Sequence, residues 1–148
     1  MSLAFRVAGR RDVAAAVELL RDDGLGQMRE TAPPEVYLAA FAEMMAMPGN
    51  RLIVGEREEQ IVATYQITII PGISLAGARR AQIEGARVAS GLRGQGIGGL
   101  LMADAEKRAR AAGAALLQLT MNQNRDEARR FYERAGFVAS HFGFKKTL

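Results

Sequence analysis

A glycine-rich turn that follows an apolar segment carries the clearest chemical signal in the chain. Its glycines are Gly94, Gly96 and Gly98. Because glycine has no Cβ, several backbone N–H groups can approach one anion there. A helix that begins near Ile97 would add unpaired N–H groups and the positive end of its dipole. Arg93 brings a permanent positive charge and a planar set of donors to the same place, so the segment predicts a phosphate-binding site.

This turn fits two kinds of nucleotide-binding site. The spacing Gly94-x-Gly96-x-x-Gly99 satisfies the dinucleotide fingerprint, which is a weak signal by itself. A Rossmann-type site also needs an acidic residue at the end of the next strand, and the run from Ala115 to Met121 ends without one. Further βα units would have to follow, whereas only about 50 residues remain after the turn. The nicotinamide interpretation is therefore disfavoured.

The turn also resembles the acyl-CoA signature of the GNAT (GCN5-related N-acetyltransferase) family. The signature residues are Arg93, Gly96 and Gly98, in the spacing Arg-x-x-Gly-x-Gly. From about Asn50 to the C-terminus the expected order of strands and helices is similar to this family. The resemblance implies an α/β fold: a mixed, mostly antiparallel sheet with a central parallel strand pair and helices on both faces. It also implies one N-acetyltransferase domain over residues 1–148, which moves an acetyl group from acetyl-CoA to a primary amine by direct attack on the thioester.

The segment from Asn124 to Phe137 resembles a second signature of the family, a short helix with a Phe-Tyr pair that stops at Gly-Phe. Here the pair is Phe131-Tyr132. The family's asparagine stands three residues before the helix alanine, where this chain has Arg125, and Asn124 comes one residue earlier. Either Asn124 or Arg125 is therefore expected to contact the cofactor.

The same resemblance assigns the rest of the cofactor site. The turn would hold the pyrophosphate through Arg93, Gly94, Gln95, Gly96, Ile97 and Gly98. The backbone of Val88, Ala89 and Ser90 would pair with the pantetheine arm like an added strand, and one of its N–H groups would polarise the thioester carbonyl. Acetyl-CoA is thus the expected cofactor, with CoA as product.

Two side chains are candidates for the proton transfers. Tyr132 is the expected general acid, because a phenol with a pKa of about 10 is protonated at neutral pH and can protonate a leaving thiolate. Glu84 is the candidate base, directly or through water, since it precedes the CoA-binding backbone on one strand. A core tyrosine and a salt-bridged surface glutamate are the structural alternatives. His141 is a further candidate base, although a lone histidine in a terminal strand is more often structural.

Composition narrows the chemistry. The 148 residues are 49% hydrophobic, which favours one buried core and one domain. Cysteine is absent and His141 is the single histidine, so neither a thiolate nucleophile nor a metal site is expected. The formal net charge of +4 arises from basic residues interspersed with acidic ones, so nucleic-acid binding is not expected.

The N-terminus shows no apolar targeting segment, so the expected location is cytoplasmic. The uncharged span from Ile61 to Ala78 contains Gln66, Pro71 and glycines, which fits a strand and a loop better than a membrane helix. The expected partners are a small-molecule or protein amine and, as in many family members, a second copy of the chain.

Apolar periodicity predicts the elements that position these residues. The predicted strands are 5–7, 51–56, 60–70, 81–88, 116–121 and one or two closing strands within 138–147. The predicted helices begin at Asp12, Thr31, Ile97 and Asp126, and the first ends at Gly24 or Gly26. Strict alternation along the strand 81–88 puts Gln82, Glu84, Ala86 and Val88 on one face, and Gly85 indicates a bulge or a close backbone approach.

The acceptor is open: amino acids, polyamines, antibiotics and protein N-termini all remain candidates. By the resemblance, Tyr37, Phe41 and the methionines of the second helix border the acceptor, although a face packed on the sheet is the simpler interpretation. A CoA-binding sensor or regulatory module without turnover is the functional alternative, and Tyr132 and Glu84 argue mildly against it.

Overall fold

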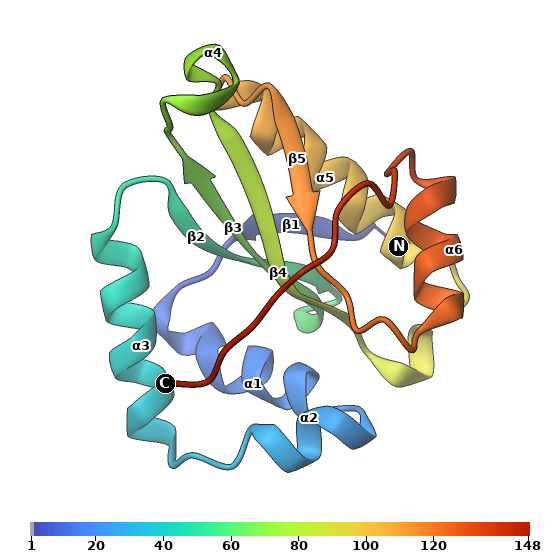
Figure 1. Ribbon diagram of the computed structural model, residues 1–148. Helices are drawn as coiled ribbons and strands as arrows, with labels where there is room; N and C mark the ends of the chain where they lie inside the picture. The colour runs from blue at the N-terminus through green and yellow to red at the C-terminus, as the bar shows by residue number, and fades with distance from the viewer. Residues whose placement is uncertain (1) are drawn as a thin grey trace.

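A five-stranded sheet forms the centre of the computed structural model, which describes residues 2–148. The strands lie side by side in chain order: β1 (Ala4–Val7), β2 (Asn50–Arg57), β3 (Gln60–Ile70), β4 (Arg80–Val88) and β5 (Leu116–Leu119). The first four are antiparallel neighbours, whereas β4 and β5 are parallel (Figure 1). The mixed sheet with one parallel pair confirms the predicted fold class.

Helices cover both faces of this sheet (Figure 1). The helical elements are η1 (Arg10–Asp12), α1 (Val13–Arg21), α2 (Gly24–Arg29), α3 (Pro34–Ala46), α4 (Ser74–Gly77), η2 (Ser90–Leu92), α5 (Ile97–Ala111) and α6 (Asp126–Arg134). Val13 of α1 and Phe41 of α3 pack with Val54 of β2. The neighbouring residue, Ile53, packs in the cluster of α5. Because adjacent strand residues point to opposite faces, α1 and α3 lie on one face and α5 lies on the other.

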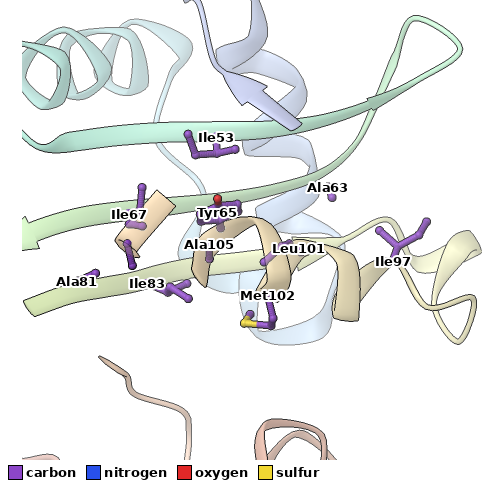
Figure 2. Close-up of a cluster of buried hydrophobic side chains, with 11 residues drawn as sticks. Ile53, Ala63, Tyr65, Ile67, Ala81, Ile83, Ile97, Leu101, Met102 and Ala105 are labelled. Carbon is purple, nitrogen blue, oxygen red and sulfur yellow. The ribbon is translucent and has the colours of Figure 1, made fainter. Parts of the chain in front are cut away.

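The larger core lies between α5 and the sheet (Figure 2). Tyr65 of β3 is fully buried there, next to apolar side chains such as Leu101 of α5. Its hydroxyl donates to Asp104 Oδ2 at 2.5 Å, and Arg108 pairs with the same carboxylate at 2.8 Å. A buried phenol needs such a partner. Burial, followed by the hydrogen bond to Asp104, raises the pKa of Tyr65. This polar contact ties α5 to the middle of the sheet.

A bulge interrupts β4 at the position that the glycine indicated. Gln66 of β3 faces Glu84, whereas Thr64 faces Arg87, so one extra residue of β4 lies between these pairs. Gly85 has a φ of 61°, a left-handed conformation that favours glycine. The predicted bulge is confirmed.

The bulge overturns the predicted strict alternation of faces along β4. Before it, Ile83 lies in the core against α5, and after it Ala86 and Val88 pack in that same core. Glu84 lines a cavity with residues of α1 and α3 on the opposite face. The prediction that Glu84 shares a face with Ala86 and Val88 is wrong, because the extra residue shifts the alternation of side chains between the two faces by one position.

The two parallel strands separate just before the bulge. Their pairing ends where Ile83 lies beside Leu119, and β4 continues to Val88. The last part of β4 therefore has β3 on one side and a free backbone edge on the other, where β5 has already ended.

The first predicted helix is divided in two. α1 ends at Arg21, and Asp23 accepts a hydrogen bond from the N–H of Gly26, which caps the start of α2. A Cβ on Gly26 would stand 1.8 Å from the carbonyl oxygen of Leu20, so only glycine permits this close turn. The prediction that one helix ends at Gly24 or Gly26 is wrong, since these glycines belong to α2.

The predicted closing strands within 138–147 do not form in the described part of the chain. After α6 the chain is an extended tail that pairs with no strand (Figure 1). Val138, Phe142 and Phe144 are 82%, 91% and 95% exposed. The outer edge of β5 is free, yet these residues stay exposed and do not pair with it. The prediction failed because alternating apolar residues form a strand only when they also pack against neighbouring side chains, and local sequence does not encode that packing.

Candidate functional site

The glycine turn presents backbone rather than side chains in front of α5. Gly94 and Gly96 have φ values of 78° and 82°, and Gly96 is the residue that caps α5. No heavy atom lies within 4 Å of a Cβ built on either one. Gln95 between them is exposed, whereas Ile97 begins the helix as predicted and is buried in the core. The turn thus offers open N–H groups at the positive end of a 15-residue helix.

Gly98 has a packing function that the motif did not suggest. A Cβ at this position would stand 3.2 Å from Cζ of Phe131 in α6. Since this separation is shorter than ordinary van der Waals contact, the missing side chain lets α6 approach the first turn of α5. The glycine motif therefore also positions the helix that carries Tyr132.

Arg93 and Ser90 connect the turn to the end of α1. Arg93 is exposed, and its guanidinium donates to the carbonyl oxygens of Val88 at 3.2 Å and of Asp22 at 3.0 Å. The carboxylate of Asp22 accepts from the N–H of Ser90 at 2.8 Å and from its hydroxyl at 3.0 Å. These two hydrogen bonds lower the pKa of Asp22. Asp22 is a residue that sequence reasoning missed, because it lies 68 positions away from its partner.

The three residues expected to pair with pantetheine differ in whether their backbone N–H group already has a hydrogen-bond partner. The N–H of Ala89 donates to the carbonyl of Val62 in β3 at 2.9 Å, and that of Ser90 is held by Asp22. Consecutive strand residues direct their N–H groups to opposite edges, so the N–H of Val88 faces the edge left free by β5. Val88 therefore has the backbone donor best placed to polarise a carbonyl.

A first cavity, here named the α6 cavity, lies along this edge. Its volume is about 80 Å³, and it is lined by Ala86, Arg87, Val88, Gly98, Leu101, Met102, Phe131 and Tyr132. The ring of Tyr132 makes edge contacts with Phe131 and Phe137, with centroids 5.2 and 5.9 Å apart. Burial raises the pKa of Tyr132, and the charges of Arg125 and Arg87 oppose this shift. The phenol is therefore protonated at neutral pH.

The two candidates for the second signature's cofactor contact occupy different surroundings. Asn124 and Arg125 are both exposed, and the N–H of Asn124 donates to the side-chain oxygen of Asn122 at 3.0 Å. Arg125 immediately precedes α6, and its charge acts on Tyr132 and on Asp23. The positive charge of Arg125 thus opposes the rise in the pKa of Tyr132 that burial causes.

A second cavity, here named the α3 cavity, lies on the opposite face of the sheet. Its volume is about 140 Å³, and its lining comprises Val13, Ala16, Val17, Leu20, Tyr37, Ala40, Phe41, Met44, Leu52, Thr64, Gln66, Glu84 and Gly85. Tyr37, Phe41 and one methionine of α3 thus line a cavity as the sequence suggested. Glu84 is exposed at this cavity and accepts a long hydrogen bond from Gln82 at 3.4 Å.

The bulge of β4 is the point where the two cavities adjoin. Gly85 lines the α3 cavity, and the next residue, Ala86, lines the α6 cavity. Glu84 and Tyr132 therefore line different cavities, which adjoin at the backbone of Gly85 and Ala86. His141 lines neither cavity; it is exposed in the tail, where its Nδ1 lies 2.6 Å from the hydroxyl of Ser140.

Within residues 2–148, no group of three or more acidic, histidine or cysteine side chains is placed to hold a metal ion. No helix in this part of the chain is both long and apolar enough to cross a bilayer.

Comparison with known proteins agrees with this architecture. The chain is 53% identical over 57 residues to the aminoalkylphosphonate N-acetyltransferase of Salmonella typhimurium, and the aligned part spans 38% of this chain and 37% of that relative. Among solved structures, a protein of Bacillus halodurans C-125 described as a transcriptional regulator has a TM-score of 0.94 and 41% identity over 99% of this chain and 100% of that one.

A Trypanosoma brucei acetyltransferase has a TM-score of 0.81 and 27% identity over 99% of this chain and 100% of its own. The model of the Acetyltransferase (GNAT) family matches residues 13–137. With this match over most of its length, the chain belongs to the GNAT family.

Proposed function

We propose that the protein is an acetyl-CoA-dependent N-acetyltransferase that acts on a primary amine. The observation that carries this proposal is the meeting of two cavities at the bulge of β4. One cavity contains Tyr132, a protonated phenol, and the other contains the carboxylate of Glu84. A donor and an acceptor bound in these cavities would meet at Gly85 and Ala86, with an acid on one side and a base on the other.

The residues at the α6 cavity fit acetyl-CoA. Beyond Ile83 the edge of β4 has no neighbouring strand, so an extended pantetheine arm has backbone to pair with. The turn at Gly94 and Gly96 has open space where a side chain would otherwise block a phosphate. Arg93 supplies charge next to that turn, and either Asn124 or Arg125, which directly precede α6, would contact the cofactor from the other side. Acetyl-CoA would supply an activated thioester to this edge.

The chain's own groups account for the proton transfers. The N–H of Val88 donates a hydrogen bond to the carbonyl oxygen as negative charge develops there. Transfer forms the amide C–N bond and breaks the C–S bond. The proton lost by the amine nitrogen passes to Glu84, directly or through water, and the departing sulfur takes the proton of Tyr132. Solvent then restores both groups, so the net products are an acetamide and a thiol.

A broad amine panel tests this function. Wild-type protein is mixed with acetyl-CoA and with amino acids, polyamines, aminoglycosides, aryl- and alkylamines, 2-aminoethylphosphonate and peptides with free N-termini. Thiol release and the mass of the acetylated product are measured. Calorimetry of CoA binding accompanies it: Arg93→Ala should weaken binding, whereas Arg110→Ala, a surface residue of α5 paired with Glu106, should not. Failure of the whole panel would contradict the proposal.

A CoA-binding regulatory module is the second candidate. The 41% identical Bacillus halodurans protein is described as a transcriptional regulator, and that description favours this alternative. Such a module would bind acetyl-CoA with the same dependence on Arg93 but release no thiol with any amine. Tyr132→Phe would then leave acetyl-CoA binding unchanged, and thiol release would be absent in both proteins.

A further inference from the structure

The walls of the α3 cavity are apolar over most of their area. Valine, leucine and alanine side chains of α1 form one wall, and Phe41, Met44 and Ala40 of α3 form the other. Neither a lysine nor an arginine is among the residues that line it. A ligand group that enters between α1 and α3 is therefore desolvated and meets no positively charged side chain among the lining residues.

The polar groups of this cavity are already engaged within the protein. The hydroxyl of Thr64 donates to the carbonyl of Ile53 at 2.9 Å, and the amide nitrogen of Gln66 donates to Asn50 at 3.0 Å. The charged group of the lining is Glu84, which is exposed at the β4 end. A cationic amine is attracted to that end, whereas an anion is repelled there.

The arginines that lie closest in sequence to the lining residues form hydrogen bonds or ion pairs with other groups of the protein. Arg51, next to Leu52, donates to the carbonyl of Asn50 at 2.7 Å. Arg21, next to Leu20, pairs with Glu18 on the same helix at 3.6 Å. Arg87, two residues after Gly85, pairs with Asp23 at 3.2 Å and lines the other cavity. None of these contacts directs a positive charge to the α3 cavity, so a carboxylate or phosphonate bound there would lack a counter-charge.

The volume of the cavity indicates the size of the apolar group that fits inside it. The cavity measures about 140 Å³, and an apolar cavity of about 150 Å³ is known to hold one benzene molecule. A phenyl ring or an alkyl chain of similar volume therefore fits between α1 and α3.

We infer that the acceptor is a primary amine with an apolar body of about phenyl size and no anionic group, its nitrogen at Glu84 and its body between α1 and α3. This inference rests on the proposed function, since the cavity is taken as the acceptor site. It distinguishes the chain from the aminoalkylphosphonate acetyltransferase to which part of it is similar.

Matched pairs of amines test the chemistry of the body. 2-Phenylethylamine and phenylalanine differ by a carboxylate beside the nitrogen, and hexylamine and 6-aminohexanoate differ by one at the far end. With acetyl-CoA, kcat/KM for the first member of each pair should exceed that for the second by about 100-fold or more, because a buried unpaired carboxylate is strongly disfavoured. 2-Aminoethylphosphonate should be as poor as the carboxylates.

Two alanines of α3 supply a matched pair of variants. Ala40 lines the cavity and Ala39 does not, and both are exposed on the same helix. Ala40→Leu adds three carbon atoms to the cavity wall and should raise KM for 2-phenylethylamine about tenfold or more, with KM for acetyl-CoA unchanged. Ala39→Leu should change neither constant.

A measurement of 2-phenylethylamine binding tests the cavity without requiring acetyl transfer. Calorimetry of 2-phenylethylamine in the presence of CoA should show binding to wild type and to Ala39→Leu, and about tenfold weaker binding to Ala40→Leu. If phenylalanine, 6-aminohexanoate or 2-aminoethylphosphonate is the better substrate, the inference fails while the acetyltransferase stands. If 2-phenylethylamine binds with this dependence but no amine is acetylated, the function fails and the apolar cavity stands. Absence of 2-phenylethylamine binding overturns the inference.

Discussion

Tyr132 lies half-buried between the rings of Phe131 and Phe137 and faces the α6 cavity. Burial raises the pKa of its hydroxyl, so the phenol keeps its proton at a higher pH than an exposed tyrosine does. The aromatic contacts restrict the ring, and Gly98 allows α6 to approach closely enough to place it. Ring position and proton affinity together suit a general acid.

Tyr132→Phe should lower kcat by about 100-fold or more, since the ring and its packing remain while the proton is lost. Steady-state thiol release measures this change, and CoA affinity should stay close to wild type. In wild type, activity that depends on the phenol proton should persist through neutral pH and decline only when pH rises through the raised pKa. An unchanged kcat in Tyr132→Phe would remove the phenol from the mechanism.

At the scale of elements, the turn before α5 depends on glycine at one capping position. Gly96→Ala introduces a Cβ at a φ of 82° and should cost about 1 kcal/mol of stability. As the N–H groups move, the Kd for CoA should rise about tenfold. Calorimetry and chemical denaturation measure both effects.

Gly99→Ala is the control for that substitution. Gly99 lies in α5 with open space around its Cβ position, and its φ is not positive. Alanine there should leave the Kd for CoA unchanged and raise stability by about 0.5 kcal/mol. Equal effects of the two substitutions on CoA binding would show that the conformation of Gly96 is unimportant.

A second element-scale contact joins β1 to the start of α1. Asp12 is buried, and its carboxylate accepts from Arg6 at 2.7 and 3.0 Å and from the N–H of Gly9 at 2.8 Å. The hydrogen bond from Arg6 is the main cause that lowers the pKa of Asp12. Asp12→Asn should therefore destabilise the protein by about 2 kcal/mol at pH 7.

The pH dependence of this contact has a definite sign. Because the folded-state pKa lies below the unfolded value, the stabilisation is complete above the unfolded pKa of about 4 and is lost as pH falls through the folded pKa. Urea denaturation should show a difference between wild type and Asp12→Asn at pH 7 that shrinks below pH of about 4. A constant difference across this range would contradict the assignment.

At the scale of the whole molecule, two cores share one sheet. Ile53 and Val54 are neighbours in β2 and belong to different cores. Loosening either core exposes the same strands, so we expect residues 1–148 to unfold as a single domain. Thermal unfolding followed by near- and far-ultraviolet circular dichroism should give coincident transitions. Two separated transitions would indicate two independent units.

The tail after α6 is the other feature of the whole molecule. Phe142 and Phe144 are almost fully exposed, and such exposure in a terminal segment is typical of a surface that another chain covers. We expect a homodimer that involves this tail. Sedimentation velocity should show a dimer for wild type and a monomer for the double variant Phe142→Ser, Phe144→Ser, while Val36→Ser, an exposed apolar residue of α3, should remain a dimer. A monomeric wild type would contradict this expectation.

Local sequence was sufficient wherever the determining interactions are short-range. The glycines at 94 and 96 predict a turn and a helix start because a left-handed φ and the absence of Cβ are properties of single residues. Gly85 predicted the bulge for the same reason. Periodicity located the hairpin of β2 and β3 and the helices α3, α5 and α6, because the apolar positions of each lie within a few turns of chain.

Tertiary structure decided what depends on residues far apart in the chain. The bulge reversed the faces of β4 and placed Glu84 in a different cavity from Val88, which no alternation rule anticipates. The contact of Asp22 with Ser90 spans 68 positions. The closing strands did not form because strand formation depends on tertiary packing that the alternation of apolar residues does not encode. The α3 cavity, whose lining contains neither lysine nor arginine, exists only where α1, α3 and three strands converge, so residue types alone could not define its chemistry.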